Sequence, residues 1–159
     1  MEIVPPFETA VGRVGLCICF DVSFLALYLN IKLEIHMPCL QLRFPEISLA
    51  LKRQNAQIIT YPSAFTVPTG SAHWEALLRA RAIETQSYVI AAAQAGFHNK
   101  KRRSYGHSMI VNPWGEVVAS LGGDFKEPEI ATADIDLDLL SKIRREMPLL
   151  RRTDIYPEV

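Results

Sequence analysis

The sequence predicts a mixed α/β domain built in layers. Three nearly continuous apolar runs have the length and composition of strands buried on both faces. These runs are residues 11–20, 56–61 and 87–94. Stretches with helical signals lie between or after the runs, so strands and helices alternate along the chain. A chain of 159 residues, 49% hydrophobic and 21% charged, is large enough for one such domain with its own core.

The first predicted strand and helix are separated by an unusual passage. The strand runs from Val11 to Phe20 and is almost wholly apolar after Arg13. Pro45 and Glu46 then suit the first turn of a helix, where a missing N–H costs nothing and a carboxylate meets the helix dipole. We expect this helix to run to about Arg53, with Asn55 as its C-cap.

The second predicted strand, Ala56 to Tyr61, leads into a long helix. Ser71 is the expected N-cap of this helix, and Glu75 lies in its expected first turn. An apolar stripe at helical spacing predicts the side of the helix that packs on the core. The stripe consists of Trp74, Leu77, Leu78 and Ala82.

The last third of the chain predicts a strand, a hairpin, another strand and a helix. The strand at Ser87 to Gln94 is rich in small residues, which permit close packing of layers. Asn112 to Gly115 is a Pro/Gly turn, so the short apolar segments on either side of it predict a hairpin. Those segments are 107–111 and 116–121, and a strand at Ile130–Ile135 and a helix at Leu137–Arg145 follow.

Composition and charge exclude several classes of protein. The formal net charge is zero, and the most basic run, Lys100 to Arg103, is interpreted as a solvated loop, so we expect no nucleic-acid partner. Polar and charged residues interrupt the apolar passage Phe24 to Leu40, which is therefore not expected to span a membrane. The N-terminus carries no signal-peptide pattern, so we expect an intracellular protein.

The cysteines and histidines predict free thiols rather than a metal centre. There are three cysteines, at positions 17, 19 and 39, and the odd number fits a reducing compartment. Cys17 and Cys19 are too close in sequence for an easy disulfide. None of the four histidines has a metal-ligand spacing to a cysteine, so we expect no metal and no cofactor.

Cys19 stands where a nucleophile would be useful. It ends a predicted buried strand, and backbone N–H groups and a helix dipole at such a junction lower the pKa of a thiol. The backbone N–H of Phe20 is then placed to stabilise an oxyanion. The alternative is a buried structural cysteine, which is the usual state of a free cysteine. Cys17 lies in mid-strand and is interpreted as core.

A nucleophilic cysteine needs a base, and the sequence leaves its identity open. His73, His107 and Glu75 are candidates by residue type. Each also has a plain structural interpretation, His73 and Glu75 as polar residues of a surface helix and His107 as the end of a strand.

Four segments together resemble the carboxy-terminal half of the nitrilase superfamily, and within it the deaminated glutathione amidase branch. They are VGRVGLCICFD, LRFPEISLAL, AQIITYPSAFTVPTGSAHWEALLRARAIETQSYVIAAAQAG and SYGHSMIVNPWGEVVAS. The resemblance implies an α-β-β-α sandwich that forms a homodimer in the cytoplasm or mitochondria. It implies hydrolysis of the C–N bond of a small amide by a Glu-Lys-Cys triad, without a cofactor and without a membrane partner.

The resemblance assigns residues to roles by their motifs. Cys19 matches the nucleophile and the Phe20 amide matches an oxyanion donor. A second group matches segments near the mouth of the substrate pocket: Pro62, Ser63, Ala64, Phe65, His73, Trp74 and Glu75. A third group matches recurrent charged positions that we interpret as structural: Asp21, Arg43, Arg81 and Glu84.

The sequence departs from the family in what precedes Cys19. The family glutamate and lysine lie on strands before the cysteine, and only 18 residues precede it here. We therefore expect residues 1–159 to form a partial domain without the N-terminal half, with impaired catalysis. Two alternatives remain open: a non-catalytic subunit that binds a full-length partner, and a cysteine hydrolase that uses His73 or His107 as its base.

Residues 22–41 have no counterpart in the family pattern. Deleting them joins CFD directly to LRFPEISLAL, with no residue lost or gained. We interpret the block as an insert, and its ends are compatible with a retained short intron of in-frame length. The alternative is a genuine insertion, although long apolar loops are uncommon in compact domains. If it is translated, we expect it to separate Cys19 from the helix that should support its thiolate.

Overall fold

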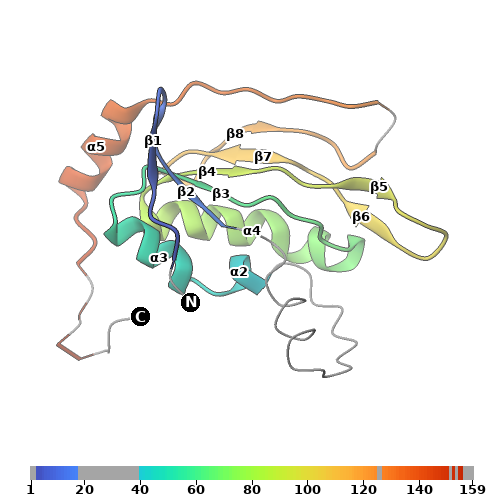
Figure 1. Cartoon of the computed structure of the whole chain (residues 1–159), viewed down its shortest axis with the longest axis horizontal. Coiled ribbons are helices and arrows are strands. Elements are labelled where there is room, and N and C mark those ends of the chain that lie inside the picture. The colour runs from blue at the N-terminus through green and yellow to red at the C-terminus, as the bar shows by residue number, and fades with distance from the viewer. Residues whose placement is uncertain (1–2, 18–39, 125–126, 151, 153, 156–159) are drawn as a thin grey trace.

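The computed structural model describes residues 3–17, 40–124, 127–150, 152 and 154–155. Its helices and strands alternate along the chain, as the apolar runs predict (Figure 1). In chain order the elements are β1 (Phe7–Thr9), β2 (Gly12–Leu16), α2 (Leu40–Arg43), α3 (Glu46–Arg53), β3 (Ile58–Thr60), α4 (Val67–Thr85), β4 (Tyr88–Ala91), β5 (Ala95–Phe97), β6 (Arg103–Tyr105), β7 (Met109–Val111), β8 (Val117–Ser120) and α5 (Leu137–Glu146).

Six of the strands form one sheet in the order β1-β2-β3-β4-β7-β8. The pairs β2/β3 and β3/β4 are parallel, whereas β1, β7 and β8 each pair with their neighbour in antiparallel fashion. The carboxyl ends of β2, β3 and β4 therefore meet at one edge of the sheet. In open α/β sheets this edge is where ligands bind.

One face of the sheet, which we call the helix-covered face, lies against α3 and α4 (Figure 1). Its core contains Ile59, Val89 and Val111 from the sheet, packed with Leu51 and Leu78 from the helices. Gly15 permits this close approach, because a Cβ at that position would lie only 3.0 Å from the Leu51 side chain. The predicted buried strands thus pack as expected on the helical side.

The opposite face of the sheet is only partly covered. Ile58 and Tyr88 are buried beneath Leu140 of α5, with Ile135 packed beside them. The cross-strand register places Phe7 on this same face, in line with Val14 and Ile58. The register also aligns a second row, Leu16, Thr60, Ile90 and Ile110. We call this side the open face, because Phe7 and Leu16 are exposed there.

The start of the long helix and the basic loop differ from the prediction. The long helix begins at Val67 rather than after Ser71, because Thr66 is extended and Pro68 takes the first turn, where proline is well tolerated. Glu75 consequently lies two turns into α4. The basic loop is also more ordered than predicted, since β5 and β6 on either side of it pair as a hairpin.

The strand predicted at 130–135 is wrong in one respect: no ladder pairs with it among the described residues. The chain is nevertheless extended there and runs above the sheet toward α5 (Figure 1). α5 itself begins where predicted, because the carboxylate of Asp136 accepts hydrogen bonds from the N–H groups of Asp138 and Leu139, both at 2.9 Å.

Candidate active site

Backbone hydrogen bonds between neighbouring chains continue beyond the carboxyl ends of β2, β3 and β4. Cys17 donates its N–H to the Thr60 carbonyl at 3.1 Å, and Tyr61 donates to Ile90 at 2.9 Å. Ser63 continues the pattern with an N–H bond of 2.8 Å to Ala92. These bonds hold the strand that leads toward position 19 in a fixed place beside its neighbours.

The predicted nucleophile and its neighbours, Cys19, Phe20 and Asp21, lie outside the described residues. The structure follows the chain to Cys17, which is 1% exposed. Burial raises the pKa of the Cys17 thiol to about 12, although a hydrogen bond with Tyr61 and the charge of Arg81 act in the opposite direction. The interpretation of Cys17 as core is therefore confirmed, and its thiol is not available as a thiolate at neutral pH.

A buried polar cluster surrounds the Cys17 sulfur. The Tyr61 hydroxyl contacts both this sulfur and the Ser48 hydroxyl. Burial raises the pKa of Tyr61, so this phenol remains protonated and serves as a hydrogen-bonding group. Because Ser48 belongs to α3 and Tyr61 follows β3, the cluster joins the end of the sheet to the helical layer.

The segment predicted at the mouth of the pocket alternates between the core and solvent. Pro62 is exposed, whereas Ser63 is buried and donates its hydroxyl to the Tyr61 carbonyl at 3.1 Å. Ala64 is half-buried. Phe65 is buried and packs against Trp74, with ring centroids 5.1 Å apart.

The three predicted pocket residues of α4 point in different directions. The Trp74 side chain is buried, and its Nε1–H donates to the His107 carbonyl at 2.7 Å. His73 is exposed, and its Nδ1 lies 3.3 Å from the Arg43 guanidinium. Glu75 is exposed and pairs with Arg79 at 3.5 Å. The structure thus does not gather these three side chains into one site.

Charged residues tie α4 to the chain that enters α3. Arg81 is buried, donates to the Leu42 carbonyl at 3.1 Å and pairs with Glu84 at 2.7 Å. Arg43 stacks over the Phe65 ring at 5.5 Å from its centroid. Arg81 thereby anchors α2 to α4 just before α3 begins.

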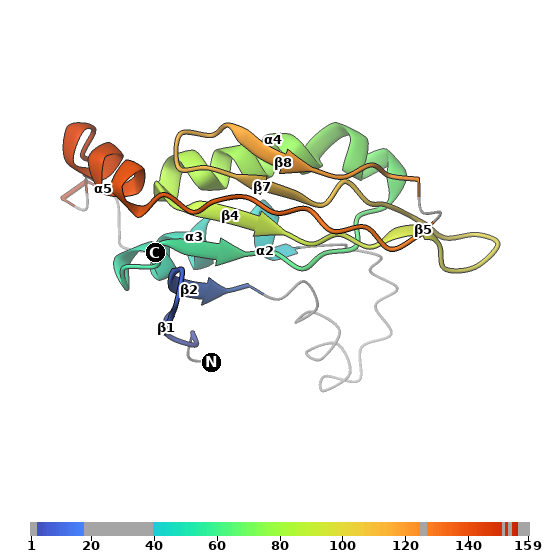
Figure 2. The same ribbon diagram turned by 90° about the horizontal axis from the view of Figure 1, so that it is seen from above.

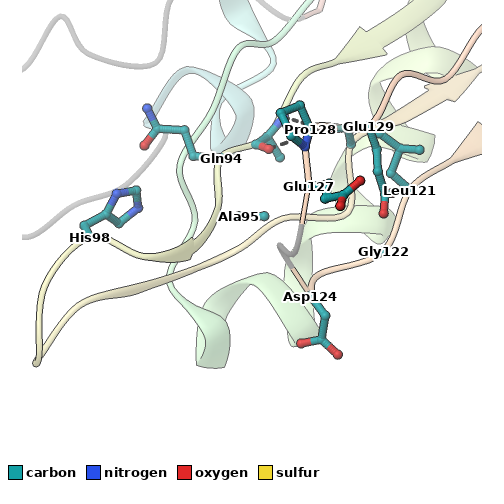
Figure 3. Close-up of a pocket in the computed structure, with 11 residues that line it drawn as sticks. Gln94, Ala95, His98, Leu121, Gly122, Asp124, Glu127, Pro128 and Glu129 are labelled. Carbon is teal, nitrogen blue, oxygen red and sulfur yellow. Dashed lines mark hydrogen bonds between the residues drawn. The ribbon is translucent and has the colours of Figure 1, made fainter.

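A cavity of about 360 Å³ opens at the same edge of the sheet, beyond the end of β4 (Figure 3). Its walls come from the residues after β4, from the start of β7 and from the chain that follows β8. The lining residues are Ala93, Gln94, Ala95, His98, Ser108, Leu121, Gly122, Asp124, Glu127, Pro128 and Glu129. None of them was predicted from the sequence as a pocket residue.

The cavity nevertheless adjoins the predicted segment. Ser63 pairs with Ala93, and Gln94 donates its N–H to the Ser63 carbonyl at 2.9 Å. Since neighbouring strands lie about 4.8 Å apart, the end of β2 is roughly 10 Å from the end of β4. The sequence contained one indication of this cavity, namely that Ser63 follows one predicted buried strand and Ala93 lies near the end of another.

The histidines proposed as bases are engaged elsewhere. His107 stacks on Tyr105, and its Nδ1 lies 2.8 Å from the Tyr105 carbonyl. His73 contacts Arg43, as described above. His98, which lines the cavity, has its Nε2 2.6 Å from the Ser104 hydroxyl. No group of three or more metal-ligating side chains occurs within the described ranges, and no helix in them has the length and apolar content needed to cross a membrane.

Comparisons with known proteins point to one family. The sequence model of the family "Carbon-nitrogen hydrolase" matches residues 26–145. A probable hydrolase of Schizosaccharomyces pombe, nit2, is 50% identical over 158 residues, which are 99% of this chain and 50% of that protein. The deaminated glutathione amidase of Homo sapiens is 49% identical over 153 residues, 95% of this chain and 40% of that protein.

Solved structures agree with the sequence comparison. The NitFhit protein of Caenorhabditis elegans aligns with a TM-score of 0.80 at 46% identity, over 98% of this chain and 33% of that one. Nit3 of Saccharomyces cerevisiae, described as a nitrilase-superfamily member, aligns with a TM-score of 0.73 at 30% identity, over 96% and 47%. The predicted α/β class and the resemblance are confirmed. This chain spans half or less of the length of these four relatives.

Proposed function

The chain belongs to the carbon-nitrogen hydrolase family, and we propose that it carries the thiol-bearing part of a site that hydrolyses a small amide. The main support is the edge of the sheet toward which β2 leads. The strand is fixed there by the bond from Cys17 to Thr60, two residues before Cys19. A cavity of about 360 Å³ opens at the same edge, a size suited to a small ligand.

The proposed reaction uses Cys19 as a nucleophile. Its thiolate attacks the amide carbonyl carbon, and the Phe20 N–H donates to the oxygen that becomes negative. Collapse of this intermediate breaks the C–N bond, and the nitrogen takes a proton and leaves as ammonia. Water then attacks the thioester, releasing a carboxylic acid and restoring the thiol.

The names of the relatives suggest the substrate class. Several are deaminated glutathione amidases, so we propose a short amide of that type as the substrate. We place the activity inside the cell, in the cytoplasm or mitochondria, which fractionation of cells would test.

We further propose that residues 1–159 alone hydrolyse the amide slowly. Among the described residues that precede Cys19, the only carboxylate is Glu8, which is exposed and pairs with Arg13 at 3.6 Å. No lysine occurs in that stretch. Loss of a positioned base typically slows a reaction by about 10²–10⁴-fold.

A second candidate function is a non-catalytic subunit that joins a full-length partner, or a second copy of itself, through the outside of the helical layer. Exposed Phe44 and Ile83 in that layer favour it. Mixing the chain with full-length nit2 and measuring co-purification tests this role. Failure to co-purify, together with a monomeric chain in light scattering, would rule it out.

The proposed chemistry is tested by trapping the covalent intermediate. The chain is incubated with a short dicarboxylic monoamide and with its more reactive ester, and intact mass is recorded. We expect an acyl adduct on Cys19 that Cys19→Ala abolishes and Cys17→Ala leaves unchanged. An adduct that persists in Cys19→Ala, or the absence of any adduct with the ester, would refute the assignment.

A further inference from the structure

We propose that Lys52 and Arg144 form a binding site for a phosphate group at the amino edge of the parallel strands. This edge is the end of the sheet opposite the cavity. Both cations lie in the last turn of a helix, and both contact the same residue, Gln86. The proposal does not depend on the proposed amide hydrolysis, because it uses no residue of that site.

Three helices end close to this edge. α3 ends at Arg53, α4 at Thr85 and α5 at Glu146. Figure 1 and Figure 2 both show α3 and α5 at one end of the molecule, whereas the hairpin of β5 and β6 lies at the other. The chain also enters β3 and β4 here, through residues 54–57 and 86–87. Side chains from separate helices can therefore reach one common point.

Gln86 is the residue on which the two cations meet. The Lys52 ammonium donates to the Gln86 side-chain carbonyl and to the Glu84 backbone carbonyl, both at 3.3 Å. Arg144 donates its Nε–H to the Gln86 backbone carbonyl at 3.1 Å. The side-chain amide of Gln86 in turn donates to the Met147 carbonyl at 2.7 Å, and Gln86 is buried. The contact residue shared by the two cations is thus held in place.

Each cation keeps hydrogen-bond donors for a ligand. An ammonium has three N–H groups and a guanidinium has five. Lys52 uses two of its three in the bonds above. Arg144 uses its Nε and also its Nη2, which donates to the Ala56 carbonyl at 2.7 Å and to the Ser87 hydroxyl at 3.0 Å. Its Nη1 bonds to none of the described residues, so donors of both cations remain available beside Gln86.

The positive charge at this point is not balanced. In the part of the chain that the structure describes, neither Lys52 nor Arg144 forms an ion pair with a carboxylate, and Glu84 pairs with Arg81. Burial lowers the pKa of Lys52 and the charge of Arg144 lowers it further, although Glu84 acts in the opposite direction. Each helix end contributes about half a negative charge. The ends of α3, α4 and α5 together therefore supply less than the two positive charges.

The arrangement of the free donors favours phosphate over a carboxylate. A carboxylate prefers two parallel N–H groups of one guanidinium. Arg144 cannot offer them, because its Nε and Nη2 are already bonded to carbonyl groups. A phosphate group has three acceptor oxygens and can accept from an ammonium and a guanidinium nitrogen at once. Its charge of about −1.5 to −2 at pH 7 also matches the two cations.

The test is titration of the chain with inorganic phosphate at pH 7 in a calorimeter, with sodium chloride holding the ionic strength constant. We expect saturable binding at one site. Lys52→Met removes a charged donor, so it should weaken binding by at least about tenfold. Lys142→Met is the matched control, because it removes an exposed lysine of α5 and changes the net charge equally. It should bind phosphate as the wild-type chain does.

Thermal unfolding gives a second measurement. Phosphate that binds only the folded chain raises the ratio of folded to unfolded chain by about elevenfold at ten times its dissociation constant. Phosphate also stabilises proteins by exclusion from their surfaces. The quantity compared is therefore the gain in the wild type against the gain in Lys52→Met at one phosphate concentration. Lys52→Gln is a second variant that removes the charge while keeping a donor for the Glu84 carbonyl, and it should lose the same gain.

Phenyl phosphate, titrated in the same way, distinguishes two sources of the phosphate group. Binding as tight as that of inorganic phosphate would support a phosphorylated molecule as the ligand, and weaker binding would support free phosphate.

Three outcomes would overturn the proposal. One is a wild-type chain that binds neither compound, which would leave the two cations as caps of helix ends only. Another is binding that Lys52→Met and Lys52→Gln leave unchanged. The third is an equal loss of affinity in Lys142→Met, which would show that phosphate responds to net charge rather than to this site.

Discussion

Ile59 and Leu16 belong to neighbouring strands of one sheet, yet Ile59 is 0% exposed and Leu16 is 43% exposed. Ile59 points into the helix-covered face, where α3 and α4 complete a core. Leu16 points to the open face, where Ile135 and Leu140 of α5 give partial cover among the described residues. The difference shows that the helical layer is self-sufficient within these residues, whereas the other layer is not. Substitutions on the two faces should therefore have very different effects on stability.

The largest effect is expected from Trp74→Ala on the helix-covered face. The change removes a side chain that is 1% exposed, its tilted ring contact with Phe65 and its hydrogen bond to the His107 carbonyl. We expect the free energy of unfolding to fall by about 3–5 kcal/mol, measured by urea denaturation. A loss below about 1 kcal/mol would mean that this core is much looser than described.

Two arginines on α4, one buried and one exposed, allow the stability effects of interior and surface substitutions to be compared. Arg81→Met removes the guanidinium, which leaves the Leu42 carbonyl without its donor and the Glu84 carboxylate without its partner at position 81. We expect a loss of about 3 kcal/mol in unfolding free energy. Arg79→Met is the comparison variant on the exposed side of the helix: it removes a pair with Glu75 that contributes about 0–1 kcal/mol and one hydrogen bond of 2.8 Å from Nε–H to the Gly115 carbonyl, which typically contributes about 0.5–1.5 kcal/mol. Equal losses for both variants would contradict the described burial.

The Cys17 thiol predicts a specific dependence on pH. Its pKa is about 12 in the folded chain against an ordinary value of 9.0, so above about pH 9 the unfolded chain loses this proton first. Stability is therefore full below pH 9 and decreases as pH rises toward 12, by about 1.4 kcal/mol per unit at most. Cys17→Ala removes this component. The difference in unfolding free energy between wild type and Cys17→Ala should therefore be smaller at about pH 10 than at about pH 8. An equal difference at both pH values would refute the assignment.

The smallest effect is expected on the open face. Leu16→Ala removes a side chain that is already 43% exposed, so the chain alone should lose less than about 1 kcal/mol of unfolding free energy. Urea denaturation of this variant beside Trp74→Ala measures the contrast between the faces directly. A loss comparable to that of Trp74→Ala would show that the open face is closed in solution.

Local signals predicted the helical layer well. Pro45 and Glu46 mark the start of α3, whereas the C-cap is Gln54 rather than the predicted Asn55, which follows it with a positive φ of 63°. Trp74, Leu78 and Ala82 are buried, as their spacing predicts. The Asn112–Gly115 turn joins β7 and β8. In each case the signal and the structure depend on residues only a few positions apart.

Features that depend on distant partners were predicted less well. Segment 130–135 has the composition of a strand but no ladder in the described ranges, because a ladder needs a second strand. Ser71 has the chemistry of an N-cap, yet its hydroxyl donates to the Pro68 carbonyl inside α4. The cavity collects residues from three separate segments, and no local pattern marks such a set. Cys19 and Phe20 remain predictions, since they lie outside the described residues.

The bonds from Cys17 to Thr60 and from Arg81 to Leu42 have a consequence for the chain on either side of residues 18–39. The first bond joins the residue after β2 to β3, just before residues 18–39. The second joins α2 to α4, just after them. Both bonds join described residues outside that range, so neither depends on the length of chain between them; for a flexible connection, doubling the length adds only about 0.6 kcal/mol of closure entropy. The end of β2 and the start of the helical layer are thus each held to the rest of the fold by a bond of their own, independently of the sequence that joins them.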